Sequence, residues 1–191
     1  MAKVSDMEPE IDQKSVLSVN WGLYMGAGIL LMLLGAVAIL IPAIASWGVT
    51  VFIGWILLFG AVFLFGTAFS FREGGRLVIR LLWAVAALLA GLYLLINPGQ
   101  GTETLTLVLV IYFIAMGGFR LLVAARERGE SGTGWLAING ALSLLLGLFI
   151  LLDFPSSADW AIGLLVGIDF IFTGWVLITI SMVGKQAARE A

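Results

Sequence analysis

The residue best placed to do chemistry is Asp169, a carboxylate inside a long apolar stretch near the C-terminus. It lies about nine residues into that stretch, which at about 1.5 Å per residue puts it near the middle of a bilayer. A charged carboxylate at that depth costs about 2.5–3.5 kcal/mol, so we expect it to be paired or protonated. Three roles stay open: a hydrogen-bonding staple between helices, a proton or pH sensor, and a transport site.

Hydrogen-bond donors for Asp169 are suggested by an internal repeat with a period of about 57 residues. Tyr112 lies one period before Asp169 in the sequence, and Trp55 lies two periods before it. If the repeats surround a three-fold axis that this position faces, the Tyr hydroxyl and the Trp N–H can donate to the carboxylate. Thr173, one turn after Asp169, shares its helix face. We therefore predict an intramembrane polar cluster of Asp169, Tyr112, Trp55 and Thr173.

Arg120 is the other charge inside an apolar stretch. It lies about five residues from the end of that stretch, so its guanidinium is expected to snorkel toward the membrane surface along its aliphatic stem. By helix rise Arg120 is about 10 Å from the level of Asp169, too far for an easy direct pair. We interpret it as an interfacial anchor.

Most catalytic chemistry is excluded by residue types that the chain lacks. It contains no histidine and no cysteine, which removes thiolate chemistry, Cys/His metal sites and Ser–His triads. Glu103, Asp153 and Asp159 lie in short connections, where we expect solvated carboxylates, and no two acids form a convincing catalytic pair. The net charge is −2, and nothing resembles a basic stripe for nucleic acid. We expect a protein without enzymatic activity, metal, cofactor or nucleic-acid partner.

The composition identifies the medium in which these residues must be placed. Of the 191 residues, 61% are hydrophobic, 12% are charged and 24 are glycine, whereas a soluble domain is about 25% charged. There is too little polar surface to cover a water-soluble globule, which excludes a soluble enzyme, a disordered chain and a disulfide scaffold. The chain is expected to be an integral membrane protein, with the lipid bilayer as its first partner.

Six apolar stretches have the length of about 20 residues that crosses a bilayer. They cover residues 21–41, 47–69, 79–96, 104–125, 135–152 and 160–183. Pro42, Pro98 and Pro155 are expected to end the first, third and fifth helices. The helix after each proline is expected to have an N-cap: Ser46 for the second helix, Thr102 or Thr104 for the fourth, and Ser157 or Asp159 for the sixth. The predicted fold is all-α, a polytopic membrane protein of six transmembrane helices in three repeated hairpins.

Basic residues set the expected orientation of the six spans. Nine of the ten Lys and Arg residues fall on one side of the predicted spans. Eight lie in the tail 1–20, in the connections after the second and fourth spans, or in the tail 184–191, and Arg80 lies at the start of the third span. Because positive charge favours the cytoplasmic side, both termini are expected to be cytoplasmic. The transmembrane domain is then residues 21–183.

Glycines repeat with nearly the same period in both sets of spans. Gly35, Gly91 and Gly147 are evenly spaced along the chain, once in each odd span. A second evenly spaced series in the even spans consists of Gly60, Gly117 and Gly174. Small residues let helices approach closely in lipid, which gives no hydrophobic drive for association. We predict repeats at about residues 21–71, 77–125 and 133–183, and favour helix packing within the chain over a homodimer face for these glycines.

These repeats resemble the HdeD-type acid-resistance membrane proteins, a bacterial six-span family built from a short repeated hairpin. The resemblance covers residues 21–183 and is carried by four phrases. They are GILLMLLGAVAILIP (28–42), LYLLINPG (92–99), ALSLLLGLFILLDFP (141–155) and IGLLVGIDFIFTGW (162–175). It implies the bacterial inner membrane and a role in survival at low pH, and it supplies no catalytic residues. We expect the protein to act as a structural or interacting component in acid or envelope stress. One alternative is a transporter or proton pathway through Asp169, and another is an accessory subunit of a larger membrane complex. A homo-oligomer is the other partner left open.

Overall fold

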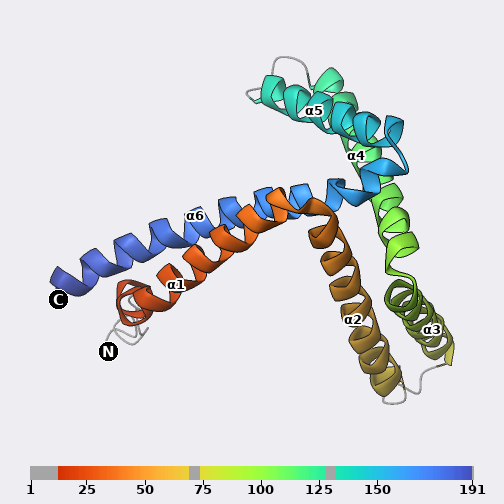
Figure 1. Cartoon of the computed structure of the whole chain (residues 1–191), viewed down its shortest axis with the longest axis horizontal. Coiled ribbons are helices and arrows are strands. Elements are labelled where there is room, and N and C mark those ends of the chain that lie inside the picture. Colours follow the sequence, from red (N-terminus) through yellow and green to blue (C-terminus); the bar gives the residue numbers. More distant parts are fainter. Residues whose placement is uncertain (1–12, 69–73, 128–131, 191) are drawn as a thin grey trace, which may run out of the picture. The chain divides into compact units, whose positions relative to one another are not determined.

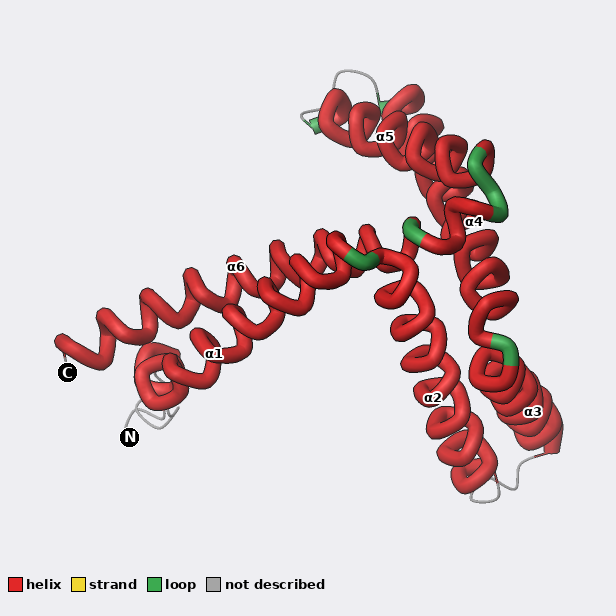
Figure 2. The backbone as a smooth tube through the Cα atoms, in the orientation of Figure 1, coloured by secondary structure: helices red, strands yellow, loops and turns green. Residues whose placement is uncertain are grey.

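The computed structural model describes residues 13–68, 74–127 and 132–190, and the regular structure within these ranges is entirely helical. Its long helices are α1 (Gln13–Leu40), α2 (Pro42–Ala68), α3 (Gly74–Ile96), α4 (Pro98–Arg126), α5 (Thr133–Leu152) and α6 (Ala161–Glu190), with a short 3₁₀ helix, η2 (Ser156–Asp159), before α6 (Figures 1 and 2). Among the described residues, six helices contain a stretch long and apolar enough to cross a membrane. The prediction of an all-α fold with six membrane-spanning helices is confirmed.

The proline breaks are tighter than the sequence suggested. One residue separates α1 from α2 and α3 from α4, and Pro42 and Pro98 begin the second helix of each pair. Proline suits this position, because the N–H that it lacks would have no partner in the first turn. Ser46 and Thr102 therefore lie one turn inside their helices, and predicting them as N-caps was wrong. Asn97 holds the N-cap position of α4 and makes no side-chain capping bond.

Both predicted tails are partly helical. Helix α1 begins at Gln13, so residues 13–20 belong to it, and α6 continues to Glu190 through most of the predicted tail 184–191. Residues 1–12 of the N-terminal tail lie outside the described residues, as do the basic residues Arg72 and Arg128.

The chain forms two compact units, divided at Leu40/Ile41 and at Leu165/Val166. The first unit consists of α1 and the part of α6 from Val166 onward, which lie side by side (Figure 1). At one end of this pair, Ser181 Oγ donates a 2.7 Å hydrogen bond to the carbonyl oxygen of Trp21. The Lys185 ammonium lies 5.2 Å from the centre of the Trp21 ring, a cation–π contact.

The second unit contains α2 to α5, η2 and the first turn of α6. Within it α2 packs along α3 and α4 packs along α5, while α2 also contacts α4, and η2 contacts both α2 and α4. Val110, Ile150 and Ala161 form a small buried apolar cluster. Each sequence repeat holds one odd and one even helix, but the close pairs of this unit join an even helix to the odd helix of the next repeat.

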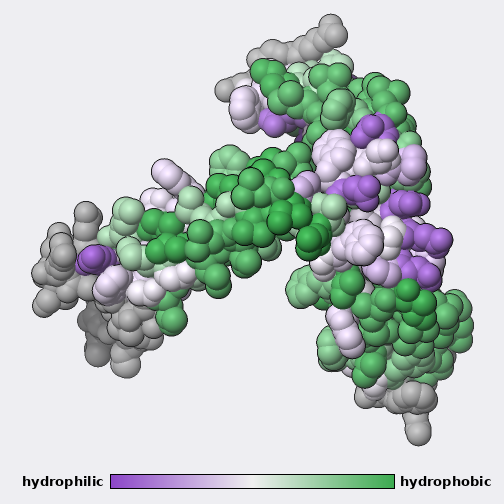
Figure 3. All heavy atoms as spheres, viewed as in Figure 1, coloured by the Kyte–Doolittle hydropathy of each residue, from purple (hydrophilic) through white to green (hydrophobic). Residues whose placement is uncertain are grey.

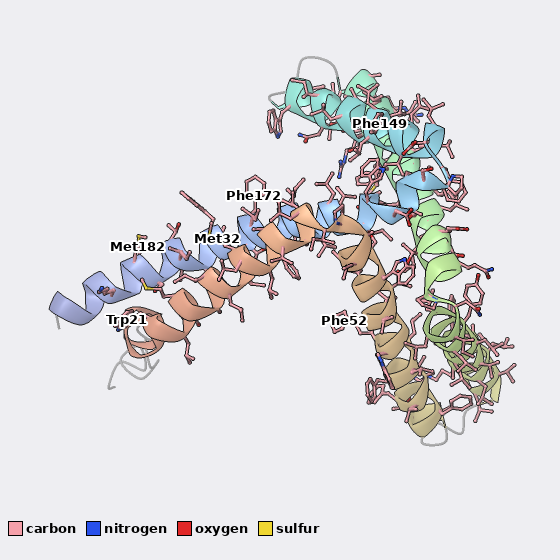
Figure 4. The ribbon with its side chains drawn as sticks, viewed as in Figure 1. Trp21, Met32, Phe52, Phe149, Phe172 and Met182 are labelled. Carbon is pink, nitrogen blue, oxygen red and sulfur yellow. The ribbon has the colours of Figure 1, made fainter. Side chains whose placement is uncertain are left out.

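The helix surfaces are largely apolar, as Figure 3 shows over α1 and α6. Large side chains such as Phe52 on α2 and Phe172 on α6 are exposed and point outward (Figure 4). Such exposure is ordinary for helices whose solvent is lipid, because lipid tails are as apolar as these side chains.

Candidate functional site

Asp169 and Thr173 lie on a side of α6 that does not contact α1. The face of α6 that packs on α1 is made by Gly167, Gly174 and Ser181, whereas the side chains of Asp169 and Thr173 are exposed. Phe172, between them in sequence, points away from α1 and is 69% exposed (Figure 4). Within the described part of the chain, neither the Asp169 carboxylate nor the Thr173 hydroxyl has a hydrogen-bond partner.

Tyr112 on α4 and Trp55 on α2 are also exposed, by 52% and 50%. Their described ring contacts are with neighbours on their own helices: Tyr112 with Phe113 at 5.8 Å and Trp55 with Phe59 at 5.9 Å between ring centres. Asp169 and Thr173 belong to the first unit, and Tyr112 and Trp55 to the second. The four-residue polar cluster therefore stays a prediction.

Glycine contacts bring α1 and α6 together in the first unit. A Cβ atom placed on Gly35 would lie 2.6 Å from the carbonyl oxygen of Gly167, and one on Gly167 would lie 2.9 Å from that of Gly35. Seven residues earlier on α1, Gly28 meets Gly174 in the same way. A Cβ atom on Gly28 would lie 2.8 Å from the carbonyl oxygen of Gly174, and one on Gly174 would lie 2.6 Å from that of Gly28. Real Cβ atoms do not approach this closely, so the two backbones require glycine at these points.

The same kind of contact occurs in both helix pairs of the second unit. A Cβ atom on Gly91 of α3 would lie 2.9 Å from the carbonyl oxygen of Gly54 in α2, and one on Gly117 of α4 would lie 2.8 Å from that of Gly140 in α5. Gly147 lies against Phe113 and Ile114 of α4, where an added Cβ would meet atoms at 3.0 Å. Five of the six glycines singled out from the sequence thus lie at close helix contacts.

Gly60 is the exception, and predicting it as a packing position was wrong. A Cβ atom at Gly60 would meet nothing within 4 Å, whereas its neighbour Ala61 is fully buried. Each even helix has three buried positions spaced by seven residues in its middle and later part. They are Gly54, Ala61 and Ala68 in α2, Val110, Gly117 and Ala124 in α4, and Gly167, Gly174 and Ser181 in α6. Ala61 is the equivalent of Gly117 and Gly174.

Five buried hydroxyl side chains gather in the second unit where α2, α4 and η2 contact one another. This hydroxyl cluster consists of Ser46, Thr50, Thr102, Thr106 and Ser157, each at most 1% exposed. Ser46 Oγ accepts a 2.9 Å hydrogen bond from the backbone N–H of Gly163 and donates at 3.3 Å to the carbonyl oxygen of Asp159. Ser157 Oγ donates to the carbonyl oxygen of Ile150 at 2.7 Å. The cluster thus ties α2 to the segment that enters α6.

A threonine pair joins α2 to α4 within the hydroxyl cluster. The Oγ1 atoms of Thr50 and Thr102 are 2.7 Å apart. Thr50 also lies 2.9 Å from the carbonyl oxygen of Ser46, and Thr102 lies 2.8 Å from that of Pro98. Each hydroxyl has a single hydrogen to donate, so two hydrogens serve three contacts. The pair can therefore hold its hydrogens in either of two arrangements.

Thr106 Oγ1 differs from the rest of the hydroxyl cluster. It is buried, and it alone among the buried side-chain polar atoms of the described residues has no hydrogen-bond partner. Thr50 and Thr102 reach the carbonyl four residues earlier in their own helices, and Thr106 does not. An unsatisfied buried hydroxyl costs about 1–3 kcal/mol.

The hydroxyl cluster was missed from the sequence, although a signal was present. Ser46 and Thr50 recur as Thr102 and Thr106 in the next repeat, with the same four-residue spacing. Ser or Thr close after a proline is typical of a helix cap, whereas here Ser46 and Thr102 lie inside their helices. The described hydrogen bonds of the cluster involve hydroxyls and backbone groups, without a general base to activate a hydroxyl as a nucleophile. The arrangement is suited to holding helix ends together.

Arg120 does not extend toward the end of α4. Its Nη1 donates a 3.0 Å hydrogen bond to Ser143 Oγ on α5, and Ser143 in turn donates to the carbonyl oxygen of Asn139. Gly140 lies beside Gly117 and Arg120. Because α4 and α5 are antiparallel, Ser143 lies farther toward the start of α4, so the Arg120 side chain runs back along its own helix, as long helical side chains do. Interpreting Arg120 as a snorkelling anchor was therefore wrong.

The acidic residues in the connection between α5 and α6, Asp153 and Asp159, lie at the surface. Asp153 Oδ2 accepts a 3.2 Å hydrogen bond from Trp160 Nε1, and Asp159 borders a pocket of about 300 Å³ with Ala43, Ile44 and Trp47. Within the residues that the structure describes, no group of three or more acids could hold a metal ion. The pocket is mainly apolar, with Asp159 as its one charged lining residue.

Comparison with known proteins gives one match. The family described as a short repeat of unknown function (DUF308) matches residues 26–96 and again residues 82–152. The second match is offset from the first by the same interval that separates Gly91 from Gly35, and together the two cover well over half of the chain. No curated protein and no solved structure matches.

Proposed function

Because the chain belongs to the DUF308 short-repeat family, we propose that it is an HdeD-type protein of the bacterial inner membrane. In this proposal it is not an enzyme and contributes to acid or envelope stress resistance as a structural or interacting component. Its termini are cytoplasmic, its first partner is the lipid bilayer, and it binds neither nucleic acid nor a cofactor.

The repeat is the observation that carries this proposal. The family matches the chain twice, one repeat apart. Of the six glycines that recur with the repeat, Gly35, Gly91, Gly117 and Gly174 lie at contacts that exclude a Cβ atom, Gly147 lies at a tight contact, and Gly60 lies at none. Much of the sequence is thus accounted for by helix packing, while the described connections are short and offer no room for an extramembrane active site. The phrases shared with HdeD-type proteins support the low-pH role.

Survival of a deletion strain at low pH tests the role. We expect deletion in the native host to lower survival at least tenfold, wild type to restore it, and Gly60→Ala to restore it equally. Reconstituted protein should move no solute across vesicles. An unchanged survival curve after deletion would contradict the proposal.

The proposed topology can be tested separately. The chain has no cysteine, so single cysteines introduced at Ser156 and at Gly132 report on the two sides of the membrane. A membrane-impermeant thiol reagent applied to intact spheroplasts should label Ser156→Cys and spare Gly132→Cys. The reverse pattern would overturn the orientation.

A transporter or proton pathway is the second candidate function, and it rests on Asp169. Its carboxylate has no hydrogen-bond partner among the described residues and lies within a membrane-spanning helix, where coupling residues of transporters are found. Proton flux into vesicles carrying the purified protein should then be lost in Asp169→Asn. Equal flux from both proteins would end this alternative.

A third candidate is an accessory subunit of a larger membrane complex. The extensive apolar surface of the described helices is the feature that favours it. The native mass of the protein extracted from its host membrane tests this role. A mass that includes additional protein subunits supports it, and the mass of a homo-oligomer or a monomer contradicts it.

A further inference from the structure

The pocket beside Asp159 lies within the second unit, where the start of α2 meets η2. Three of its lining residues, Ala43, Ile44 and Trp47, come from the first two turns of α2, and Asp159 comes from the end of η2. Its volume of about 300 Å³ is at the lower end of the range for small-molecule sites, about 300–1,000 Å³. The pocket combines an apolar wall with a single carboxylate.

The two sides of this pocket are joined directly. Ser46, which precedes Trp47, donates its hydroxyl hydrogen to the backbone carbonyl of Asp159 and accepts a hydrogen bond from the backbone N–H of Gly163. Gly163 also lies so close to the carbonyl oxygen of Pro42 that a Cβ atom on it would collide with that oxygen. These contacts are buried, whereas the side chains of Trp47 and Asp159 stay exposed and line the pocket.

The pocket lies at the level where lipid headgroups are expected. The apolar stretches that could cross a membrane begin at Pro42 in α2 and at Ser156 before α6. No lining residue is more than five positions from one of these starts, which is about 8 Å at about 1.5 Å per residue. Tryptophan is enriched at this boundary between the apolar core of a bilayer and its headgroups. The Asp159 carboxylate is therefore within reach of a headgroup.

The acidic charge at this end of the helices has no basic residue beside it in sequence. The described segments 41–47, 96–104 and 152–162 contain Glu103, Asp153 and Asp159 and no Lys or Arg. Asp153 accepts a hydrogen bond from Trp160, whereas the Asp159 carboxylate forms no hydrogen bond or ion pair with a described residue. The pocket is thus complementary to a cation that carries an apolar chain.

We propose that this pocket binds a phospholipid through a primary ammonium headgroup, the chemistry of phosphatidylethanolamine. The Asp159 carboxylate accepts hydrogen bonds from the ammonium, and the Trp47 ring stabilises the same charge by a cation–π contact. The chain makes such a contact elsewhere, where Lys185 Nζ lies 5.2 Å from the centre of the Trp21 ring. A quaternary ammonium has no N–H to donate, so a choline lipid binds more weakly.

Lipid binding to the purified full-length protein in detergent, followed by native mass spectrometry, tests the proposal. Phosphatidylethanolamine should bind about tenfold more tightly than phosphatidylcholine with the same acyl chains, the change expected from one charge-assisted hydrogen bond. Asp159→Asn keeps the shape of the side chain and removes the charge, so it should abolish this preference. Glu103→Gln, which removes an exposed acid near the start of α4, is the matched control and should keep the preference of wild type.

A second variant tests the pocket instead of the charge. Ala43→Phe fills the pocket and keeps Asp159, and it should also abolish the preference for phosphatidylethanolamine. Both variants change exposed residues, so their helicity by circular dichroism should match wild type. Glycerophosphoethanolamine, the same headgroup without acyl chains, should not compete, because the acyl chains hold the lipid in the membrane at the apolar wall. Equal binding of the two lipids, an unchanged preference in Asp159→Asn, or full competition by the soluble headgroup would overturn the proposal.

Discussion

The backbone N–H of Gly163, in the first turn of α6, donates its hydrogen bond to Ser46 Oγ, one turn into α2. The first N–H groups of a helix have no partner within it, so Ser46 Oγ supplies a hydrogen-bond acceptor that the start of α6 lacks. Because Ser46 also donates to the carbonyl of Asp159, one side chain fixes both sides of the entry into α6. Two segments far apart in sequence are joined by it.

Ser46→Ala should destabilise the protein. It leaves the buried N–H of Gly163 without an acceptor, which costs about 1–3 kcal/mol. Unfolding in detergent with increasing dodecyl sulfate, followed by tryptophan fluorescence, measures the change. Ser156→Ala, which removes an exposed hydroxyl in η2, is the matched control and should leave stability unchanged; equal effects would refute the role of Ser46.

Thr106→Val should raise stability, the opposite of the usual result for a buried polar residue. Valine keeps the shape and removes a hydroxyl without a partner, for an expected gain of about 1 kcal/mol. Thr102→Val, one turn earlier, removes a bonded hydroxyl and should cost about 1 kcal/mol. The same unfolding assay applies to both, and a loss of stability in Thr106→Val would show that its hydroxyl is satisfied.

Adding one methyl group should have opposite effects at two predicted packing glycines. Gly35→Ala pushes a Cβ against the carbonyl of Gly167 and should cost about 1–3 kcal/mol, the range for overpacking. Gly60→Ala meets open space and should gain about 0.5–1 kcal/mol from the better helix propensity of alanine. Thermal unfolding midpoints in detergent measure both, and a neutral Gly35→Ala would contradict the close contact.

Ser143→Ala should destabilise the protein through Arg120. It removes the acceptor of a guanidinium hydrogen bond within the α4 and α5 pair, and bonds to charged groups are worth about 1.5–3 kcal/mol. In an Arg120→Gln background the same substitution should cost clearly less, because the charged donor is already gone. A double-mutant cycle from unfolding curves measures this coupling, and additive effects would exclude it.

The six spans, the proline breaks and the recurrence of glycine from repeat to repeat were predictable, because length, hydropathy and residue size determine them directly. Which helices pack most closely was not. A repeat period identifies equivalent positions, but it does not say whether α2 packs on α1 or on α3. The glycine pattern alone also points to Gly60 and not to the buried Ala61, because alanine fills the same role wherever the backbones are slightly farther apart.

The polar residues were harder to place, for reasons of side-chain direction. The short distance from the Arg120 Cα to the span end predicts a snorkelling side chain, whereas the side chain leans toward the start of its helix and reaches Ser143. Ser46 and Thr102 were interpreted as caps, because a proline was expected to leave a gap before the next helix. The structure has no such gap, and the hydroxyls lie inside.

The seven-residue spacing of the buried small residues also determines how each helix pair must wind. Seven residues are slightly less than two turns of a straight helix, so a contact line with this period drifts by about 20° per heptad unless the helices coil around each other with a left-handed twist. From this spacing we expect the pairs of α1 with α6, α2 with α3, and α4 with α5 to wind as antiparallel coiled coils with mainly glycine and alanine at the seam. Inserting one residue between Gly28 and Gly35 would rotate one half of α1 by about 100° against the other. No rotamer change could then restore both contacts with α6.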